Sequence, residues 1–164
     1  GGKGFPSFEY LFNSSRDTEK IAVELQDMWR KELGIETRLR SVEWKVWLSE
    51  QSALNYALCR SSWIGDYADP NTFLDMFMSN NPNNRTGFKN ARYDQLIRTA
   101  NGTPEPAARA ALLKQAEAML IREVLPVIPL YIYVGYNFFD PKRIAGIHNN
   151  LRDEHPLRAI RLID

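Results

Sequence analysis

The stretch "SFEYLFNSSRDTEKIAVELQDMWRKELGIETRLRSV" (residues 7–42) reads as a strand, a helix and a second strand in succession. Aromatic side chains alternate through residues 8–13, which is typical of a strand with one buried face. Two serines then offer N-caps for a helix over residues 16–33, whose apolar side chains recur at helical spacing. Residues 35–41 alternate again. This order predicts a parallel βαβ unit, and therefore an α/β fold.

The same alternation of strands and helices continues along the chain. Residues 127–134, "VIPLYIYV", are apolar on both faces, which favours a central strand covered from both sides. Thr103 before "PEPAARAALL" predicts a helix start with Thr103 as the N-cap. We expect a mixed sheet flanked by helices: strands near 8–13, 35–41, 56–62 and 127–134, helices at 16–33 and 104–124 packed on that sheet, and shorter helices near 44–54, 70–78 and 91–100.

Length, charge and metal-ligand content exclude several classes of function. A chain of 164 residues fits one domain with a proper core, and a net charge of +1 offers no basic field for nucleic acid. Cys59 is the sole cysteine, so neither an internal disulfide nor a cysteine-based metal cluster is possible within the chain. His148 and His155 lie seven residues apart without a third ligand nearby, and we expect no metal and no cofactor.

The stretch "RSSWIGDYADPNTF" (residues 60–73) is the candidate site. It follows a predicted parallel strand, and open α/β sheets bind ligands outside the carboxyl ends of their strands. Asp69 directly precedes Pro70, a position that favours a helix N-cap over a ligand contact. Asp66 lies too far ahead of that helix to cap it, so we expect its carboxylate to project into the crevice.

Four segments in series resemble one lobe of a known family. "SVEWKVWL", "ALCRSSWIGDYADPNTFL", "NNRTGFKNARYDQLI" and "PVIPLYIYV" are similar to the second lobe of bacterial dipeptide- and oligopeptide-binding proteins, the solute receptors of ABC importers. The resemblance runs from about residue 5 to residue 140. It implies one lobe of a two-lobed periplasmic-binding-protein fold, with peptide enclosed between the lobes.

The resemblance also assigns roles to individual residues. Asp66 matches the aspartate that pairs with the α-ammonium of a peptide, and Arg60 matches an arginine that meets the carboxylate of short peptides. Such charge-assisted pairs are the strong ones, and arginine binds a carboxylate bidentately. The implied ligand-binding set is Asn13, Trp44, Arg60, Trp63, Asp66 and Tyr67. Two alternatives stay open: Trp44 as a core residue, and Arg60 paired internally with a glutamate.

The same resemblance implies an organisation and a set of partners. Residues 1–135 form the peptide-binding lobe, and residues 136–164 form a hinge-crossing tail that completes the missing N-terminal lobe. The start "GGKGFP" is expected to be a cut within a larger receptor. The implied partners are a peptide ligand, the missing lobe and the membrane permease of the importer, without nucleic acid. The implied location is periplasmic or extracellular, membrane-anchored if the parent is a lipoprotein.

Two other functions remain possible from the residues alone. One is a hydrolase that uses Asp66 or Asp69 as general base or metal ligand in the same crevice. Ser61 and Ser62 lack a histidine base, which argues against an enzyme. The other is a receptor of the same fold for a nickel complex, haem or an oligosaccharide. The Asp66–Arg60 pair favours a zwitterion over a sugar.

Overall fold

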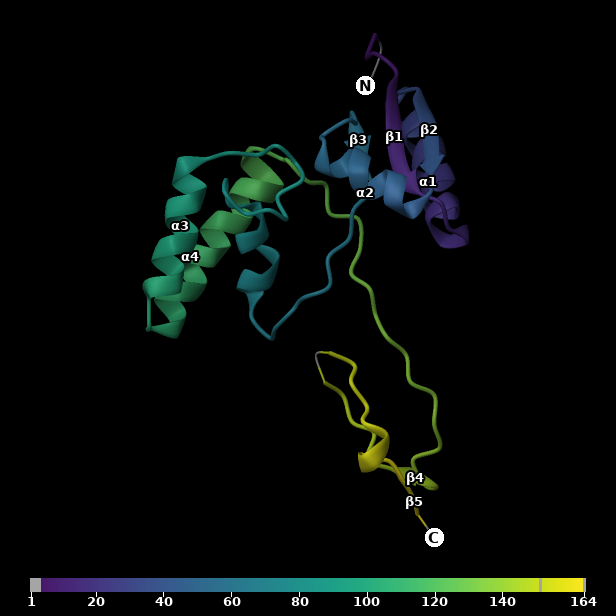
Figure 1. The fold of residues 1–164 in the computed structure, drawn as a ribbon, viewed down its shortest axis with the longest axis vertical. Helices are drawn as coiled ribbons and strands as arrows, with labels where there is room; N and C mark the ends of the chain where they lie inside the picture. The colour runs from purple at the N-terminus through teal and green to yellow at the C-terminus, as the bar shows by residue number, and fades with distance from the viewer. Residues whose placement is uncertain (1–3, 151, 164) are drawn as a thin grey trace.

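The first 60 residues of the chain contain a three-stranded parallel sheet (Figure 1). The computed structural model describes residues 4–150 and 152–163. β1 (Phe8–Asn13) is central, with β2 (Thr37–Val42) on one side and β3 (Leu58–Cys59) on the other. β1 and β2 are paired along their whole length, from Phe8 opposite Thr37 to Asn13 opposite Val42. The predicted α/β class is confirmed.

Helix α1 (Arg16–Met28) connects β1 to β2 and begins where the sequence predicts. The Ser15 hydroxyl accepts a hydrogen bond from the Thr18 N–H, which caps the helix. The last turn, η1 (Trp29–Leu33), is π-helical and ends at Gly34 with a φ of 66°, a left-handed conformation that glycine adopts without a steric penalty. Alternate residues of β1 pack with this helix and its last turn in one cluster: Tyr10, Phe12, Ala22, Leu25 and Trp29.

Helix α2 (Trp44–Ser52) follows β2, and β3 after it is shorter than predicted. Residues 56–62 are expected to form a strand, but only two of them pair with β1. One further backbone hydrogen bond, from the Arg60 N–H to the Leu11 carbonyl (2.8 Å), continues the pairing. The chain then leaves the sheet into the loop that carries the candidate site.

A second unit, mainly helical, lies beside the sheet rather than on it (Figure 1). It comprises η2 (Pro70–Phe73), η3 (Asp75–Phe77), α3 (Ala91–Gly102), α4 (Pro106–Ala118) and η4 (Met119–Glu123). Its core is separate from that of the sheet and contains Leu74, Phe88, Tyr93, Ile97, Ala100, Leu113, Ala116, Met119 and Leu120. The expectation that residues 104–124 pack on the sheet is therefore wrong, because their apolar face packs against α3. The predicted helix over 70–78 consists of two short 3₁₀ turns.

Helix α4 begins two residues later than the predicted start. Thr103 is not its N-cap: the Thr103 hydroxyl donates to the Thr99 carbonyl (2.7 Å) and ends α3 instead. Glu105 precedes Pro106, and a residue before proline is disfavoured in the helical region, so the helix begins only at Pro106. The true N-cap is Glu105, whose carboxylate accepts from two backbone N–H groups of the first turn.

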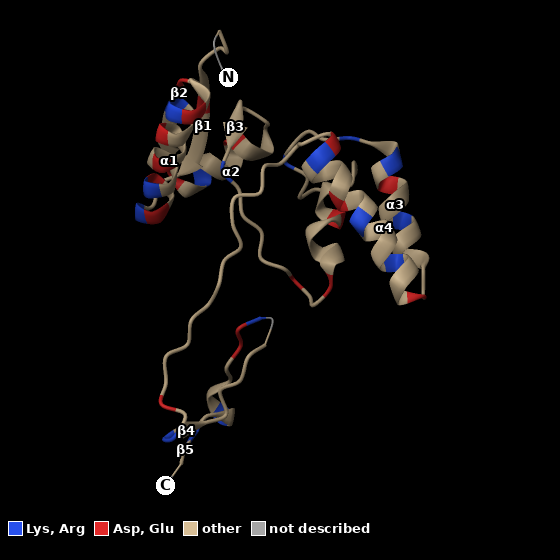
Figure 2. Ribbon diagram, turned by 180° about the vertical axis from the view of Figure 1, so that it is seen from behind, with Lys and Arg blue, Asp and Glu red and all other residues tan. Residues whose placement is uncertain are grey.

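Residues 124–139 form an extended segment, here named the arm, that passes from the helical unit to the end of β3, where Tyr133 contacts Arg60, and then runs away from both units (Figure 1). Within the described structure residues 127–134 pair with no strand, so their prediction as a central strand of this sheet is wrong. Residues 128–134 are exposed, Ile132 by 90%, whereas Val127 packs against the core of the helical unit. The arm carries no charged residue (Figure 2).

Beyond the arm, β4 (Ile144–Ala145) pairs antiparallel with β5 (Arg161–Leu162), which follows the 3₁₀ turn η5 (Leu157–Ala159).

Among the described residues, no helix has the length and apolar character needed to cross a membrane.

Candidate functional site

Asn13 and Arg60 meet at the carboxyl ends of adjacent parallel strands. Asn13 is the last residue of β1, and Arg60 directly follows β3. The Arg60 Nη1 donates to the Asn13 Oδ1 over 3.2 Å. Both residues therefore lie at the edge of the sheet where α/β folds bind ligands, a place that the strand order predicts for Arg60.

Two tyrosines of the arm join this pair. Arg60 Nη2 donates to the Tyr133 hydroxyl over 2.9 Å, and the Tyr131 hydroxyl donates to Tyr133 over the same distance. The hydrogen bond from Tyr131, together with the charge of Arg60, lowers the pKa of Tyr133. Sequence reasoning missed both tyrosines, although their spacing of two along an extended segment places them on one face.

Arg60 has only neutral side-chain partners within residues 4–150 and 152–163. None of the ion pairs there includes it, so the alternative of an internal glutamate partner is wrong for this part of the chain. Its hydrogen bonds to Asn13 and Tyr133 hold the guanidinium in place without neutralising it. A charge in this state is available to a ligand carboxylate.

Asp66 is held through its backbone while its carboxylate stays exposed. The Asp66 N–H donates to the Thr72 hydroxyl over 3.0 Å. The preceding Gly65 packs tightly, because a Cβ there would lie 3.0 Å from the Thr72 methyl group and 3.1 Å from the Phe73 ring. The Asp66 carboxylate makes no hydrogen bond or ion pair with any described residue. The loop is thus fixed and its charged group is free.

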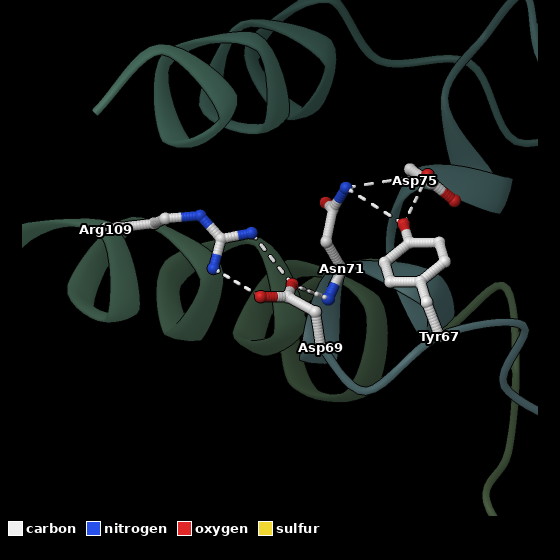
Figure 3. Close-up of polar contacts among 5 residues, drawn as sticks. All are labelled: Tyr67, Asp69, Asn71, Asp75 and Arg109. Atoms are coloured by element: carbon white, nitrogen blue, oxygen red, sulfur yellow. Dashed lines mark hydrogen bonds and ion pairs between the residues drawn. The ribbon is translucent and has the colours of Figure 1, made fainter. Parts of the chain in front are cut away.

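Asp69 has a structural role (Figure 3). Its carboxylate caps η2 by accepting from the Asn71 N–H at 2.8 Å, which confirms the predicted cap. Both of its oxygens also accept from the Arg109 guanidinium, at 2.7 and 2.8 Å. This bidentate pair joins the site loop to α4, and the sequence could not indicate it because the partners are 40 residues apart.

The Asp69–Arg109 pair should stabilise the folded chain at neutral pH. Arg109 lowers the pKa of Asp69, so this contribution is present at neutral pH and is lost as the pH falls through the lowered pKa. We expect Asp69→Asn, which keeps the N-cap, to cost about 1 kcal/mol at pH 7 because the pair is partly exposed. Chemical denaturation should show this difference shrinking at pH 3. Arg109→Met should give the same loss, and a constant difference at both pH values would contradict the assignment.

The three predicted aromatic residues lie in different environments. Trp44 is 50% exposed and stacks on Trp47 with ring centroids 4.6 Å apart, so it is not a buried core residue. The Trp63 indole N–H is buried and finds no acceptor among the described residues. The Tyr67 hydroxyl donates to Asp75 (3.1 Å) while its ring remains 45% exposed (Figure 3).

Comparison with known proteins places this arrangement in a family. The model of the bacterial extracellular solute-binding proteins, family 5 (middle region), matches residues 1–85, just over half of the chain. The dipeptide-binding protein DppE of Bacillus subtilis is 39% identical over 78% of this chain and 23% of its own length. The probable deoxycholate-binding periplasmic protein YgiS of Escherichia coli is 37% identical over 76% of this chain and 23% of its own.

A solved structure agrees with these relatives. The unliganded open form of the murein tripeptide-binding protein MppA matches 95% of this chain and 30% of its own, with a TM-score of 0.85 and 32% identity. The chain therefore spans less than a third of the relatives that it matches. With the family model, the relatives and the fold in agreement, the chain belongs to the family 5 bacterial extracellular solute-binding proteins.

Proposed function

We propose that this chain is the second lobe of a peptide receptor that serves an ABC importer, and that it binds peptides by their charged ends. The observation that carries the proposal is a pair of opposite charges on one loop: Arg60 at the carboxyl edge of the sheet, and Asp66 six residues further along, where the loop is bonded to η2. Neither charge is in an ion pair with a described residue. A peptide zwitterion supplies the two complementary charges, whatever its side chains. The names of DppE and MppA as peptide-binding proteins support this ligand class.

The aromatic residues would line the ligand cleft on the same proposal. Trp44 and Tyr67 present large exposed ring surfaces, and Trp63 lies three residues from both Arg60 and Asp66. Aromatic rings supply contact area that tolerates varied partners. Receptors for many peptides need this tolerance, because only the termini and the backbone are common to all peptides.

We further propose that residues 1–135 form the lobe and residues 136–164 cross a hinge to the rest of the receptor. Two features support this division. The arm exposes large apolar or aromatic side chains on both faces, such as Ile132 and Tyr133, and these require cover in the complete protein. The β4–β5 pair also lies well away from the sheet (Figure 1). The missing lobe would supply the cover, and the permease of the importer would receive the closed receptor in the periplasm or at the cell surface.

A non-catalytic role fits the site better than hydrolysis. The Asp69 carboxylate is bound on both oxygens by Arg109, so it is not free to act as a base or a metal ligand. Both histidines lie between β4 and β5, a segment remote from the sheet edge (Figure 1). His155 is paired with Asp153, and neither histidine is hydrogen-bonded to Asp66 among the described residues, so none is in place there to activate a nucleophile.

Isothermal titration calorimetry on the full-length receptor tests the proposal. We expect trialanine to bind, and N-acetyl-trialanine amide, which lacks both terminal charges, to bind far more weakly. Deoxycholate, suggested by the name of YgiS, should neither bind nor displace trialanine. Tight deoxycholate binding without peptide binding would overturn the peptide assignment, and cleavage of the peptide detected by mass spectrometry would overturn the non-catalytic one.

A further inference from the structure

The Tyr133 hydroxyl has an unused donor. A tyrosine oxygen carries one O–H donor and two lone pairs. Here the oxygen accepts from Arg60 Nη2 and from the Tyr131 hydroxyl, each at 2.9 Å, so both lone pairs are occupied. No acceptor among the described residues receives its O–H. The hydroxyl is therefore oriented by its two donors and still has one hydrogen bond to give.

Asn13 repeats this pattern on the other side of Arg60. Its Oδ1 accepts from Arg60 Nη1 over 3.2 Å, while its Nδ2 donates to no described residue. Arg60 itself has five N–H donors and spends two of them on these neighbours. Each side-chain acceptor of Asn13 and Tyr133 thus receives a hydrogen bond within the cluster, while donors of Asn13, Arg60 and Tyr133 are left over. A carboxylate, which only accepts hydrogen bonds, is the ligand group that completes it.

Tyr133 is accessible to such a ligand. Its side chain is 60% exposed, and it extends from an arm without charged residues, so no carboxylate of the arm competes for the donors. The contact between Tyr133 and Arg60 joins positions 73 residues apart. It therefore brings a donor from the arm to the edge of the sheet.

We infer that Tyr133 is a further ligand-binding residue, whose hydroxyl donates a hydrogen bond to the same peptide carboxylate that Arg60 binds. The inference rests on the proposed function and adds to it the residue that sharpens selectivity for a free carboxyl end. Arg60 supplies the charge, and Tyr133 with Asn13 supplies directed donors on either side of it.

The test compares dialanine and trialanine with their C-terminal amides on the full-length receptor, by calorimetry. In Tyr133→Phe, affinity for the free acids should fall by about ten- to a hundredfold, the range for a hydrogen bond to a charged group. Affinity for the amides should stay within about twofold, since a hydrogen bond to a neutral group contributes less. Tyr136→Phe is the matched control, because Tyr136 lies on the same arm, is 78% exposed and makes no hydrogen bond with a described residue.

The possible outcomes test the role of Tyr133 and the role of Arg60 separately. A selective loss of acid binding in Tyr133→Phe, absent in Tyr136→Phe and with an unchanged melting temperature, supports the inference. Equal losses for acids and amides, or no loss, overturn it and leave Arg60 as the carboxylate-binding residue. If the unmutated receptor itself fails to prefer acids over amides, the assignment of the carboxylate to Arg60 fails, and the inference with it.

Discussion

Asp66→Asn in the full-length receptor is expected to weaken the binding of free-amine peptides by about 2–5 kcal/mol, the usual cost of truncating one member of a buried charge pair. The reason is that Asp66 is held by its neighbours but not neutralised by them. Its N–H is bonded to Thr72 and Gly65 packs closely behind it, whereas its carboxylate has no partner among the described residues. A ligand ammonium enclosed between the lobes would be that partner. Calorimetry with trialanine measures the loss.

N-acetylation of the peptide separates this role from a structural one. Acetylated trialanine lacks the ammonium, so it should bind the unmutated receptor poorly, and Asp66→Asn should weaken its binding much less. Asp69→Asn is the matched control three residues away: it removes a carboxylate that Arg109 already occupies, and it should leave the preference for free amines intact. If Asp66→Asn weakens both peptides equally, Asp66 is a structural residue.

The elements that sequence predicts well are those specified by local signals. β1 and α1 follow from the alternation of residues 8–13, the serine cap and the helical spacing of apolar side chains, and all of these signals act within a few residues of each other. β2 follows from the parallel βαβ order. The cap at Asp69 is likewise local, because its acceptor and its donor are two residues apart. The α/β class required nothing more than these signals.

The errors concern which surface an apolar face packs against. The apolar stripe of residues 104–124 requires burial, but the stripe is the same whether a sheet or another helix covers it, and here α3 covers it. Residues 127–134 are apolar on both faces and yet pair with no strand of the described chain. Their apolar pattern indicates that both faces are buried in the complete protein. On the proposal above, the missing lobe of the receptor buries them.

The candidate site likewise combines features that local sequence predicts with contacts that it does not predict. The place of Arg60 at the carboxyl edge of the sheet follows from the strand order. Its hydrogen bond to Asn13 goes beyond that prediction. Asp69 differs from Asp66 because it pairs with Arg109, which is 40 positions away in the chain. Tyr133 contacts Arg60, which is 73 positions away. Such pairs depend on how the two units and the arm are placed in space, and no local pattern encodes that placement.

The two separate cores lead to a second large expected effect. Ile97 is completely buried in the core of the helical unit. Ile97→Ala removes methyl and methylene groups and leaves a cavity, and such a change typically costs about 2–5 kcal/mol. Ile132→Ala is the matched control, because Ile132 is 90% exposed and its truncation should change stability by no more than about 0.5 kcal/mol.

The positions of the tryptophans allow fluorescence to show which of the two units Ile97→Ala destabilises. Three of the four lie on helices beside the sheet, Trp29 in η1 and Trp44 and Trp47 in α2, and Trp63 lies on the site loop, so their fluorescence reports mainly on the sheet unit. Circular dichroism also reports on α3 and α4. Because the two units have separate cores, joined by polar contacts such as Arg85 to Gln51 (3.1 Å), we expect Ile97→Ala to lower the midpoint measured by circular dichroism more than the fluorescence midpoint. Equal shifts of both midpoints would show one cooperative core and contradict this division. A shift by circular dichroism alone would mean that the helical unit, which holds the site loop through Arg109, loosens before the sheet does.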